Sequence, residues 1–133
     1  MTERSIIIKV SFESGLSVRC KVDPSKSPKT VEVLLSSLPF ESEVQLWGDE
    51  VYFPVPFSAP PENPRDVVEV GDVAYWPEEP SLCLFFGPTP ISPKPDVIKP
   101  YSPVNIIGKI IEDPKLLRSV REREKVRVDK IQC

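Results

Sequence analysis

The stretch from residue 71 to residue 87 contains two short β-type runs that each end in aromatic residues. The first reads Gly-Asp-Val-Ala-Tyr-Trp-Pro from Gly71, and the second reads Ser-Leu-Cys-Leu-Phe-Phe-Gly from Ser81. A proline-bounded acidic turn over 77–80 separates them. β-branched and aromatic residues favour strands, and large aromatic side chains so close together either fill a core or line a pocket. The stretch therefore predicts a β-rich fold with aromatic side chains in its core or in a pocket wall.

Apolar side chains recur at every second position along much of the rest of the chain. Residues 5–12 and 16–22 show this pattern on either side of a tight turn at Gly15, which indicates a β-hairpin. Further strands are expected at 43–47, 50–53, 67–70, 73–76, 82–86, 104–111 and from 126 to 131. The pattern thus predicts eight or nine short strands.

Two helices are expected, and each begins with an N-cap residue followed by proline. Ser27 and Pro28 start the first helix, which Pro39 ends, and Asp113 and Pro114 start the second. The apolar stripe of the first helix consists of Val31, Leu34, Leu35 and Leu38. Helices after the second strand and before the last predict a mostly antiparallel closed barrel of about eight strands, capped by two short helices. The 133 residues are expected to form a single domain, 1–133.

Composition excludes several classes of chemistry. The chain has no histidine and a net charge of −3, which excludes histidine triads and histidine zinc sites and argues against a nucleic-acid partner. Its five glycines never approach the spacing of a phosphate-binding loop. Its three cysteines form no CxxC pair, and the longest charge-free run is too short to cross a bilayer. We therefore expect no cofactor, no metal site and no membrane partner, in a reducing cytoplasm.

Eleven of the seventeen prolines cluster in two regions, 54–64 and 88–103. Proline fixes φ and lowers the conformational entropy of the unfolded chain, so these regions are expected to be stiff loops rather than disordered linkers. Stiff loops and a surface rich in lysine and glutamate fit a thermophilic source.

Several runs resemble those of cyclophilins. Residues 105–112, read with the following helix and the strand at 126–128, resemble the closing segment of the cyclophilin barrel, and Leu84-Phe85-Phe86 resembles its pocket strand. The chain is more similar still to a family of small bacterial and archaeal cyclophilin-like proteins. The matching runs are 12–15, 38–42, 47–53, 63–65, 71–77, 83–90 and 104–109. This resemblance implies a small cyclophilin-like barrel and no particular reaction.

The chain departs from true cyclophilins at the residues of their isomerase site. Their Phe-His-Arg run, whose arginine engages the amide of the substrate proline, corresponds here to Tyr52-Phe53-Pro54, and Leu84 stands in place of their pocket glutamine. Arg65, on a stiff loop, is the one candidate to replace the catalytic arginine. The alternative role for Arg65 is a surface ion pair with Asp66 or Glu62.

The resemblance of the pocket strand favours a ligand groove on the aromatic strands. The expected groove residues are Tyr52, Phe53, Arg65, Trp76, Phe85 and Phe86. The alternative for the five aromatic residues is the barrel core. Cys83 is expected to be a small buried hydrophobe because no histidine can activate it. The adjacent carboxylates at 49–50 and 78–79 are expected to be solvated in turns.

Three kinds of function fit these residues. The preferred one is a binding module whose groove recognises a proline-containing peptide or a small apolar ligand. A peptidyl-prolyl isomerase using Arg65 or a backbone donor is the second, and a structural or subunit role is the third, since such barrels also occur in carboxylase and hydrolase assemblies. A homodimer is expected because few charges protect the strand at 6–10 from edge pairing. The barrel would also bring the chain end near the N-terminal hairpin, so a Cys20–Cys133 disulfide is the alternative to three free thiols.

Overall fold

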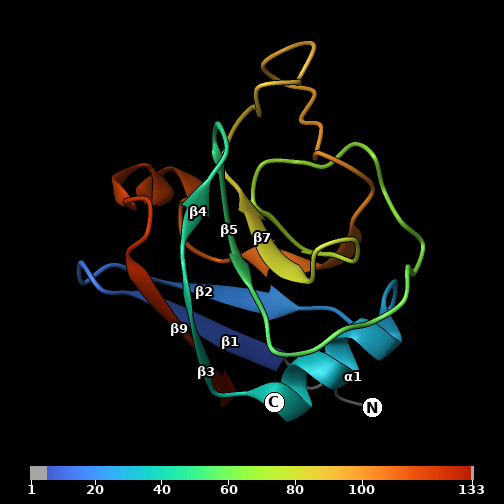
Figure 1. Cartoon of the computed structure of the whole chain (residues 1–133), viewed down its shortest axis with the longest axis vertical. Coiled ribbons are helices and arrows are strands. Elements are labelled where there is room, and N and C mark those ends of the chain that lie inside the picture. Colours follow the sequence, from blue (N-terminus) through green and yellow to red (C-terminus); the bar gives the residue numbers. More distant parts are fainter. Residues whose placement is uncertain (1–5, 133) are drawn as a thin grey trace.

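The computed structural model describes residues 6–132, which form one sheet of nine strands and two helices (Figure 1). In chain order the elements are β1 (Ile6–Phe12), β2 (Ser17–Val22), α1 (Pro28–Ser37), β3 (Phe40–Glu43), β4 (Gln45–Leu46), β5 (Glu50–Pro54), β6 (Asp72–Trp76), β7 (Ser81–Phe85), β8 (Asn105–Ile110), the 3₁₀ helix η1 (Pro114–Ser119) and β9 (Lys125–Gln132). The strands pair antiparallel in the order β3-β9-β1-β2-β8-β6-β7-β5-β4.

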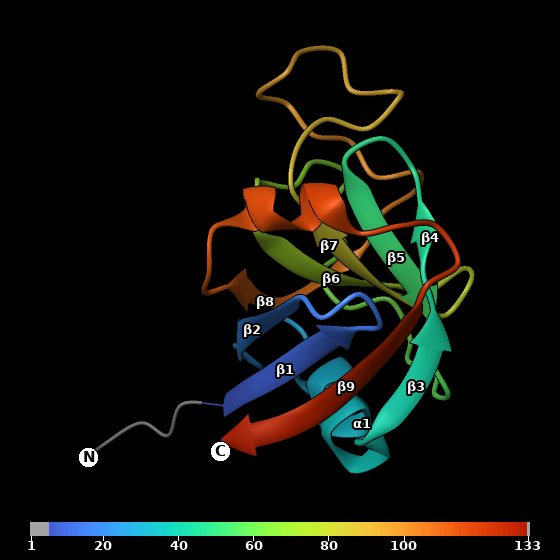
Figure 2. The ribbon, with the colours of Figure 1, turned by 90° about the vertical axis from the view of Figure 1, so that its left-hand side faces the viewer.

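The sheet curls into a nearly closed barrel because its two outermost strands are consecutive in the chain. Only Val44 separates β3 from β4. The Val44 N–H donates to the carbonyl O of Glu124 at 2.9 Å, and the Arg123 N–H donates to the carbonyl O of Val44 at 2.7 Å. Figure 2 shows β4 following β3 beside the start of β9. The predicted mostly-β barrel with two short helices is confirmed.

The predicted N-terminal hairpin is also confirmed. Ile8 lies opposite Cys20 and Val10 lies opposite Val18 across the β1–β2 pair, and all four side chains are fully buried. The turn between the strands contains Gly15 with φ of +109°, a conformation that glycine adopts without steric cost. Alternate residues of this hairpin therefore fill the barrel interior.

The two helices lie toward opposite ends of the barrel (Figures 1 and 2). α1 packs Val31 and Leu34 into the core, as its apolar stripe predicts. η1 packs Leu117 into the same core, and the Asp113 carboxylate accepts a hydrogen bond from the Lys115 N–H at 3.0 Å. The second N-cap prediction is therefore confirmed.

The N-terminus of α1 is capped by a different residue from the one expected. Ser27 stands at the N-cap position, but its hydroxyl donates to the carbonyl O of Ile106 at 3.0 Å. The Glu62 carboxylate, which comes from the loop after β5, accepts the N–H groups of Thr30 at 2.7 Å and Lys29 at 3.2 Å. A distant acidic side chain thus satisfies the free N–H groups of this helix.

One predicted strand is absent, and one observed strand was not predicted. Residues 67–70 form no strand, because only Val68 makes a bridge, to Ile98, while the side chains of Val67 and Val70 are exposed. Conversely, Phe40–Glu43 forms β3. This strand was missed because it pairs with β9 alone and buries only Phe40, so its sequence carries little apolar alternation.

β1 is not the exposed edge on which the homodimer prediction rested. It pairs with β2 on one side and with β9 on the other, so its backbone groups are already used. A homodimer remains a prediction without that support. Cys20 is buried and Cys133 lies outside the described residues, so their disulfide also stays a prediction. Within residues 6–132, no helix combines the length and apolar character that a membrane crossing requires.

The β5–β7–β6 part of the sheet is apolar on both faces. The face toward the barrel interior carries Val51, Phe53, Val73, Tyr75, Leu82 and Leu84. The outer face carries Ala74, Trp76, Cys83 and Phe85, which form a second cluster with Val68, Ile98 and Val104 from the loops. The loop between β7 and β8 (residues 86–104, the covering loop) lies against this outer face and extends past the β4–β5 turn in both views (Figures 1 and 2).

Candidate functional site

A pocket of about 230 Å³ (the aromatic pocket) lies on the outer face of the β5–β7–β6 sheet. It is formed where the strands, two turns and the covering loop meet. Its lining residues are Glu50, Tyr52, Trp76 and Cys83 from the strands, Trp47 and Glu79 from the turns, and Pro100, Tyr101, Ser102 and Val104 from the covering loop. Four of these ten are tryptophan or tyrosine, and two are glutamate, so the pocket combines aromatic walls with carboxylates.

Strand alternation places two of these residues on the pocket side of β5. Along β5, Glu50 and Tyr52 alternate with Val51 and Phe53, and the latter two are fully buried in the barrel core. Tyr52 lies opposite Cys83 on the neighbouring strand β7. Since successive strand residues face opposite sides of a sheet, the same run fills the core and builds the pocket.

The turn before β5 packs closely against the start of the covering loop. Gly48 has φ of +59°, and a Cβ atom added there would lie 3.0 Å from the carbonyl O of Pro88. The Asp49 N–H donates to that same oxygen at 3.0 Å. Only glycine allows this approach. The close contact holds Trp47 and Glu50, which lie on either side of the Gly48-Asp49 pair, at the pocket.

Hydrogen bonds hold the covering loop in place over the sheet. The N–H groups of Arg65 and Val104 each donate to the other's carbonyl O, at 2.8 Å and 3.0 Å. The Ser102 hydroxyl accepts from the Trp76 Nε1–H at 2.6 Å. These contacts position Tyr101, which lies beside Ser102, at the rim of the pocket.

The four rings contact one another edge to face. Trp76 lies next to Tyr52 with a centroid distance of 6.0 Å and an interplanar angle of 81°, and next to Tyr101 at 5.7 Å and 61°. Tyr101 also contacts Trp47 at 5.7 Å and 71°. Such T-shaped pairs are a favoured arrangement of aromatic rings. The steep angles mean that the rings form walls that meet at corners rather than a flat stack.

Glu50 brings a carboxyl group into these surroundings. Its residue is 5% exposed, and none of the ion pairs within residues 6–132 involves it. Burial raises the pKa of Glu50 from 4.5 to about 7, although a hydrogen bond with Cys83 partly opposes the rise. The prediction that Glu50 is solvated in a turn is therefore wrong, because it is the first residue of β5 and faces the outer cluster.

The groups next to Glu50 retain their protons at neutral pH. Burial, and then the charge of Glu50, raises the pKa of the Tyr52 phenol and the pKa of the Cys83 thiol. Cys83 is 1% exposed, in agreement with the prediction of a buried hydrophobe. A thiol that keeps its proton is a poor nucleophile and a poor metal ligand. The Cys83 thiol is therefore poorly suited to act as a nucleophile.

Of the six residues expected to line a groove, the structure brings two to this pocket, Tyr52 and Trp76. Phe53 is fully buried in the main core, because it alternates with Tyr52 along β5. Phe86 packs into the same core, and Phe85 is fully buried in the second cluster. The core alternative therefore describes these three phenylalanines.

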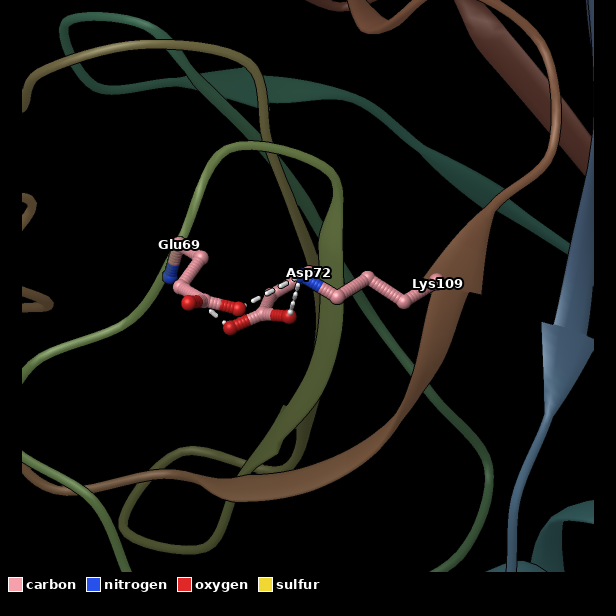
Figure 3. Close-up of polar contacts among 3 residues, drawn as sticks. All are labelled: Glu69, Asp72 and Lys109. Carbon is pink, nitrogen blue, oxygen red and sulfur yellow. Dashed lines mark hydrogen bonds and ion pairs between the residues drawn. The ribbon is translucent and has the colours of Figure 1, made fainter.

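Arg65 lies in a different hollow of the surface. Its exposed side chain lines an open groove (the charged groove), which is formed mainly by residues 21–28, by residues 65–72 and by residues 106–109 of β8. There the Lys109 Nζ lies 2.9 Å from a Glu69 carboxylate oxygen and 2.8 Å from an Asp72 carboxylate oxygen (Figure 3). The ion pairs of the described residues do not include Arg65, so neither role considered for it from the sequence is seen.

Trp47, Glu50, Glu79 and Tyr101 are the aromatic and acidic residues of the pocket that sequence reasoning missed. The alternation along β5 could have placed Glu50 beside Tyr52. No local signal predicts that Tyr101, which lies between prolines in a long loop, packs against Trp47. Among residues 6–132, no three metal-ligating side chains gather in one place.

Comparison with known proteins agrees with the fold. The family model described as cyclophilin-like matches residues 6–129. The solution structure of a hypothetical protein from Archaeoglobus fulgidus is 38% identical to this chain and superimposes with a TM-score of 0.82, covering 98% of this chain and 100% of that one. No curated protein matches the chain. These findings bear on family and fold, and they carry no ligand or reaction.

Proposed function

The chain belongs to the cyclophilin-like family, and we propose that it is a binding module that takes one small, mainly apolar group into the aromatic pocket. The group is a small organic ligand or a single side chain of a bound peptide, proline included. The observation that carries this proposal is the gathering of four aromatic rings from three separate segments around one cavity. Small-molecule sites are typically concave and lined by such rings together with a few polar groups.

The size of the pocket supports a small occupant. At about 230 Å³ it lies below the range of about 300–1,000 Å³ that is usual for drug-sized ligands. Its walls are also held rigid by the close approach at Gly48 and by the hydrogen bond between Trp76 and Ser102. A preformed pocket loses less conformational entropy when it binds.

The isomerase alternative has less support. Twisting a prolyl amide against a barrier of about 18–20 kcal/mol calls for a fixed donor to the amide nitrogen. Within residues 6–132, neither arginine nor lysine is among the residues that line the pocket, and Arg65 lies in the charged groove. A pocket with two carboxylates favours binding over this reaction.

The two tryptophans of the chain give a direct test, because both Trp47 and Trp76 line the pocket. Titration with an N-acetyl-proline amide and with a small neutral alcohol is expected to change the intrinsic fluorescence in a saturable way. In ¹H–¹⁵N spectra the two indole N–H signals should shift together with the backbone signals of residues 100–104.

Two loop variants serve as a matched pair for this test. Tyr101→Ala removes a ring of the pocket, whereas Ile91→Ala removes an exposed side chain of the same loop that is not part of the lining. The first variant should lose the response and the second should keep it. Shifts confined to the charged groove around Lys109, or no response to any ligand, would show the proposed function to be wrong.

A further inference from the structure

We propose that the aromatic pocket recognises an alkylated ammonium group, held by cation–π contacts with its rings and by the carboxylates of Glu50 and Glu79. This inference rests on the proposed function, since it names the chemistry of the occupant of the same pocket. The proposed occupant therefore carries a positive charge in addition to its apolar surface.

The rings supply the first part of this chemistry. The face of an aromatic ring carries negative charge, and a cation within about 6 Å of the ring centroid is attracted to it. Trp47, Tyr52, Trp76 and Tyr101 surround a cavity of about 230 Å³, with neighbouring ring centroids 5.7 to 6.0 Å apart. A small cation in that cavity would lie close to several rings at once.

Glu50 supplies the second part. Its carboxyl lies in the wall of the pocket, in a residue that is 5% exposed, and no ion pair within the described part of the chain neutralises it. A buried charge is costly unless it is paired. Among residues 6–132, the other charged group of the lining is Glu79, which is exposed and of the same sign. A bound cation would therefore compensate a charge that residues 6–132 leave without an ion pair.

The rings also indicate which kind of cation fits. A primary ammonium is strongly hydrated and offers three N–H donors, and a metal ion requires several converging ligands. Within residues 6–132 no group of three metal-ligating side chains is found. An alkylated ammonium gives up less hydration and presents methyl groups to the rings, which is the chemistry that aromatic cages recognise.

Choline and its neutral isostere 3,3-dimethylbutan-1-ol, in which carbon replaces the ammonium nitrogen, separate charge from shape. Both are titrated against the full chain at pH 8 and constant ionic strength, with Trp47 and Trp76 as fluorescent reporters. Choline is expected to bind at least about tenfold more tightly than the alcohol. Glu50→Gln should lower that preference, and the rings and Glu79 account for what remains. Glu78→Gln, at an exposed residue outside the lining, is the matched control and should keep the preference.

Lowering the pH gives a second readout. A permanently charged ligand should bind less tightly at pH 6 than at pH 8, because Glu50 with its raised pKa takes up a proton. The other titratable groups that line the pocket are Tyr52, Cys83, Tyr101 and Glu79. Burial raises the pKa of Tyr52 and Cys83, so both stay protonated over this range. Glu50→Gln should abolish the pH dependence, and Glu79→Gln should retain it.

The outcomes distinguish this inference from the proposed function. Equal affinity for choline and the alcohol would overturn the cation inference and leave the binding module intact. No response to any ligand would overturn both. A trimethyllysine peptide and its unmethylated form are titrated in parallel, so that binding of the peptide but not of choline identifies a protein side chain as the source of the group. Failure of both choline and the trimethyllysine peptide would overturn the inference.

Discussion

The aromatic pocket and the charged groove each contain a carboxylate residue that is 5% exposed, Glu50 in the first and Asp72 in the second. Asp72 accepts the Lys109 ammonium at 2.8 Å and the Glu69 N–H at 2.8 Å (Figure 3). Glu50 takes part in no ion pair within residues 6–132. The two carboxylates are therefore buried to the same extent, but only Asp72 has a cationic partner within the described residues.

These two carboxylates show where the fold gives up stability. A buried carboxylate with a cationic partner keeps its charge at small cost, whereas one without a partner shifts its pKa or destabilises the protein. Groups whose environment perturbs their pKa gather at functional sites more often than elsewhere. The contrast with Asp72 is what makes Glu50 stand out, and it supports the aromatic pocket rather than the charged groove as the site.

The strongest test of the contrast is Glu50→Gln. The pKa of Glu50 is 4.5 in the unfolded chain and about 7 in the folded protein, so between these pH values the folded state binds more protons. The free energy of unfolding therefore falls as the pH rises through this window, and the loss is complete above pH 7. Each pH unit is equivalent to about 1.4 kcal/mol, so the variant should be more stable than the native protein by about 3 kcal/mol at pH 8.

Urea denaturation at pH 4.5 and pH 8 measures this effect as the difference between variant and native protein, in which the titration of all other groups cancels. The gain should vanish near pH 4.5, where Glu50 is protonated in the folded state. Glu78→Gln, an exposed neighbour of the pocket, should show no such pH dependence. A Glu50→Gln variant less stable than the native protein at pH 8 would contradict the assignment of Glu50 as an unpaired buried charge.

The second test concerns the rigid construction of the pocket. Gly48→Ala forces alanine into φ of +59° and places its Cβ 2.7 Å from Pro90 Cδ. The left-handed conformation and the overpacking together should cost about 2 to 3 kcal/mol. Gly15→Ala is the control, because φ is also positive there but nothing lies within 4 Å of the new Cβ. Equal losses of unfolding free energy for both variants would show that the turn does not depend on its packing against the covering loop.

Much of the fold could be predicted from the sequence because local patterns determine it. Alternation and the turn at Gly15 predicted the β1–β2 hairpin, and the Asp113-Pro114 pair predicted the start of η1. β3 was missed because its Glu-Ser-Glu run is solvated and its pairing with β9 is non-local. Valines alone suggested a strand at 67–70, but this segment makes only one bridge, through Val68. Pattern predicts an element, whereas long-range pairing decides whether it forms.

The site was less predictable because it is built from contacts that are distant in sequence. The aromatic strands drew attention to Tyr52 and Trp76, and both residues line the pocket. Their neighbours on the same strands face the core, as the full burial of Phe53 shows. The contact between Tyr101 and Trp47 depends on the path of the whole covering loop. Burial of Glu50 depends on that loop too, so a pair of acids in a turn gave no sign of it.

The third test removes the cationic partner of Asp72 and should lower the free energy of unfolding, whereas the first test should raise it. Lys109→Met leaves Asp72 buried without its cation, a change that costs about 3 to 5 kcal/mol in a fully buried pair. The Lys109 side chain is 51% exposed, and solvent screening reduces the expected loss to about 1 to 2 kcal/mol. Urea denaturation at pH 7 should show this loss. Lys21→Met, an exposed lysine of the same groove, should show almost none. Recovery of stability in the double variant with Asp72→Asn would confirm that the unpaired carboxylate is the cause.

The smallest expected effect is that of Arg65→Ala, which removes a cation of the charged groove without touching the aromatic pocket. Its exposed guanidinium takes part in no ion pair within residues 6–132, so its loss should change the free energy of unfolding by less than about 0.5 kcal/mol. Choline binding should be unaffected. Isomerisation of a short Ala-Pro peptide should stay near the uncatalysed rate in both the native protein and the variant, because no arginine of residues 6–132 lines the pocket. A native rate comparable to that of an authentic cyclophilin, lost in Arg65→Ala, would reverse the comparison and make the charged groove the active site.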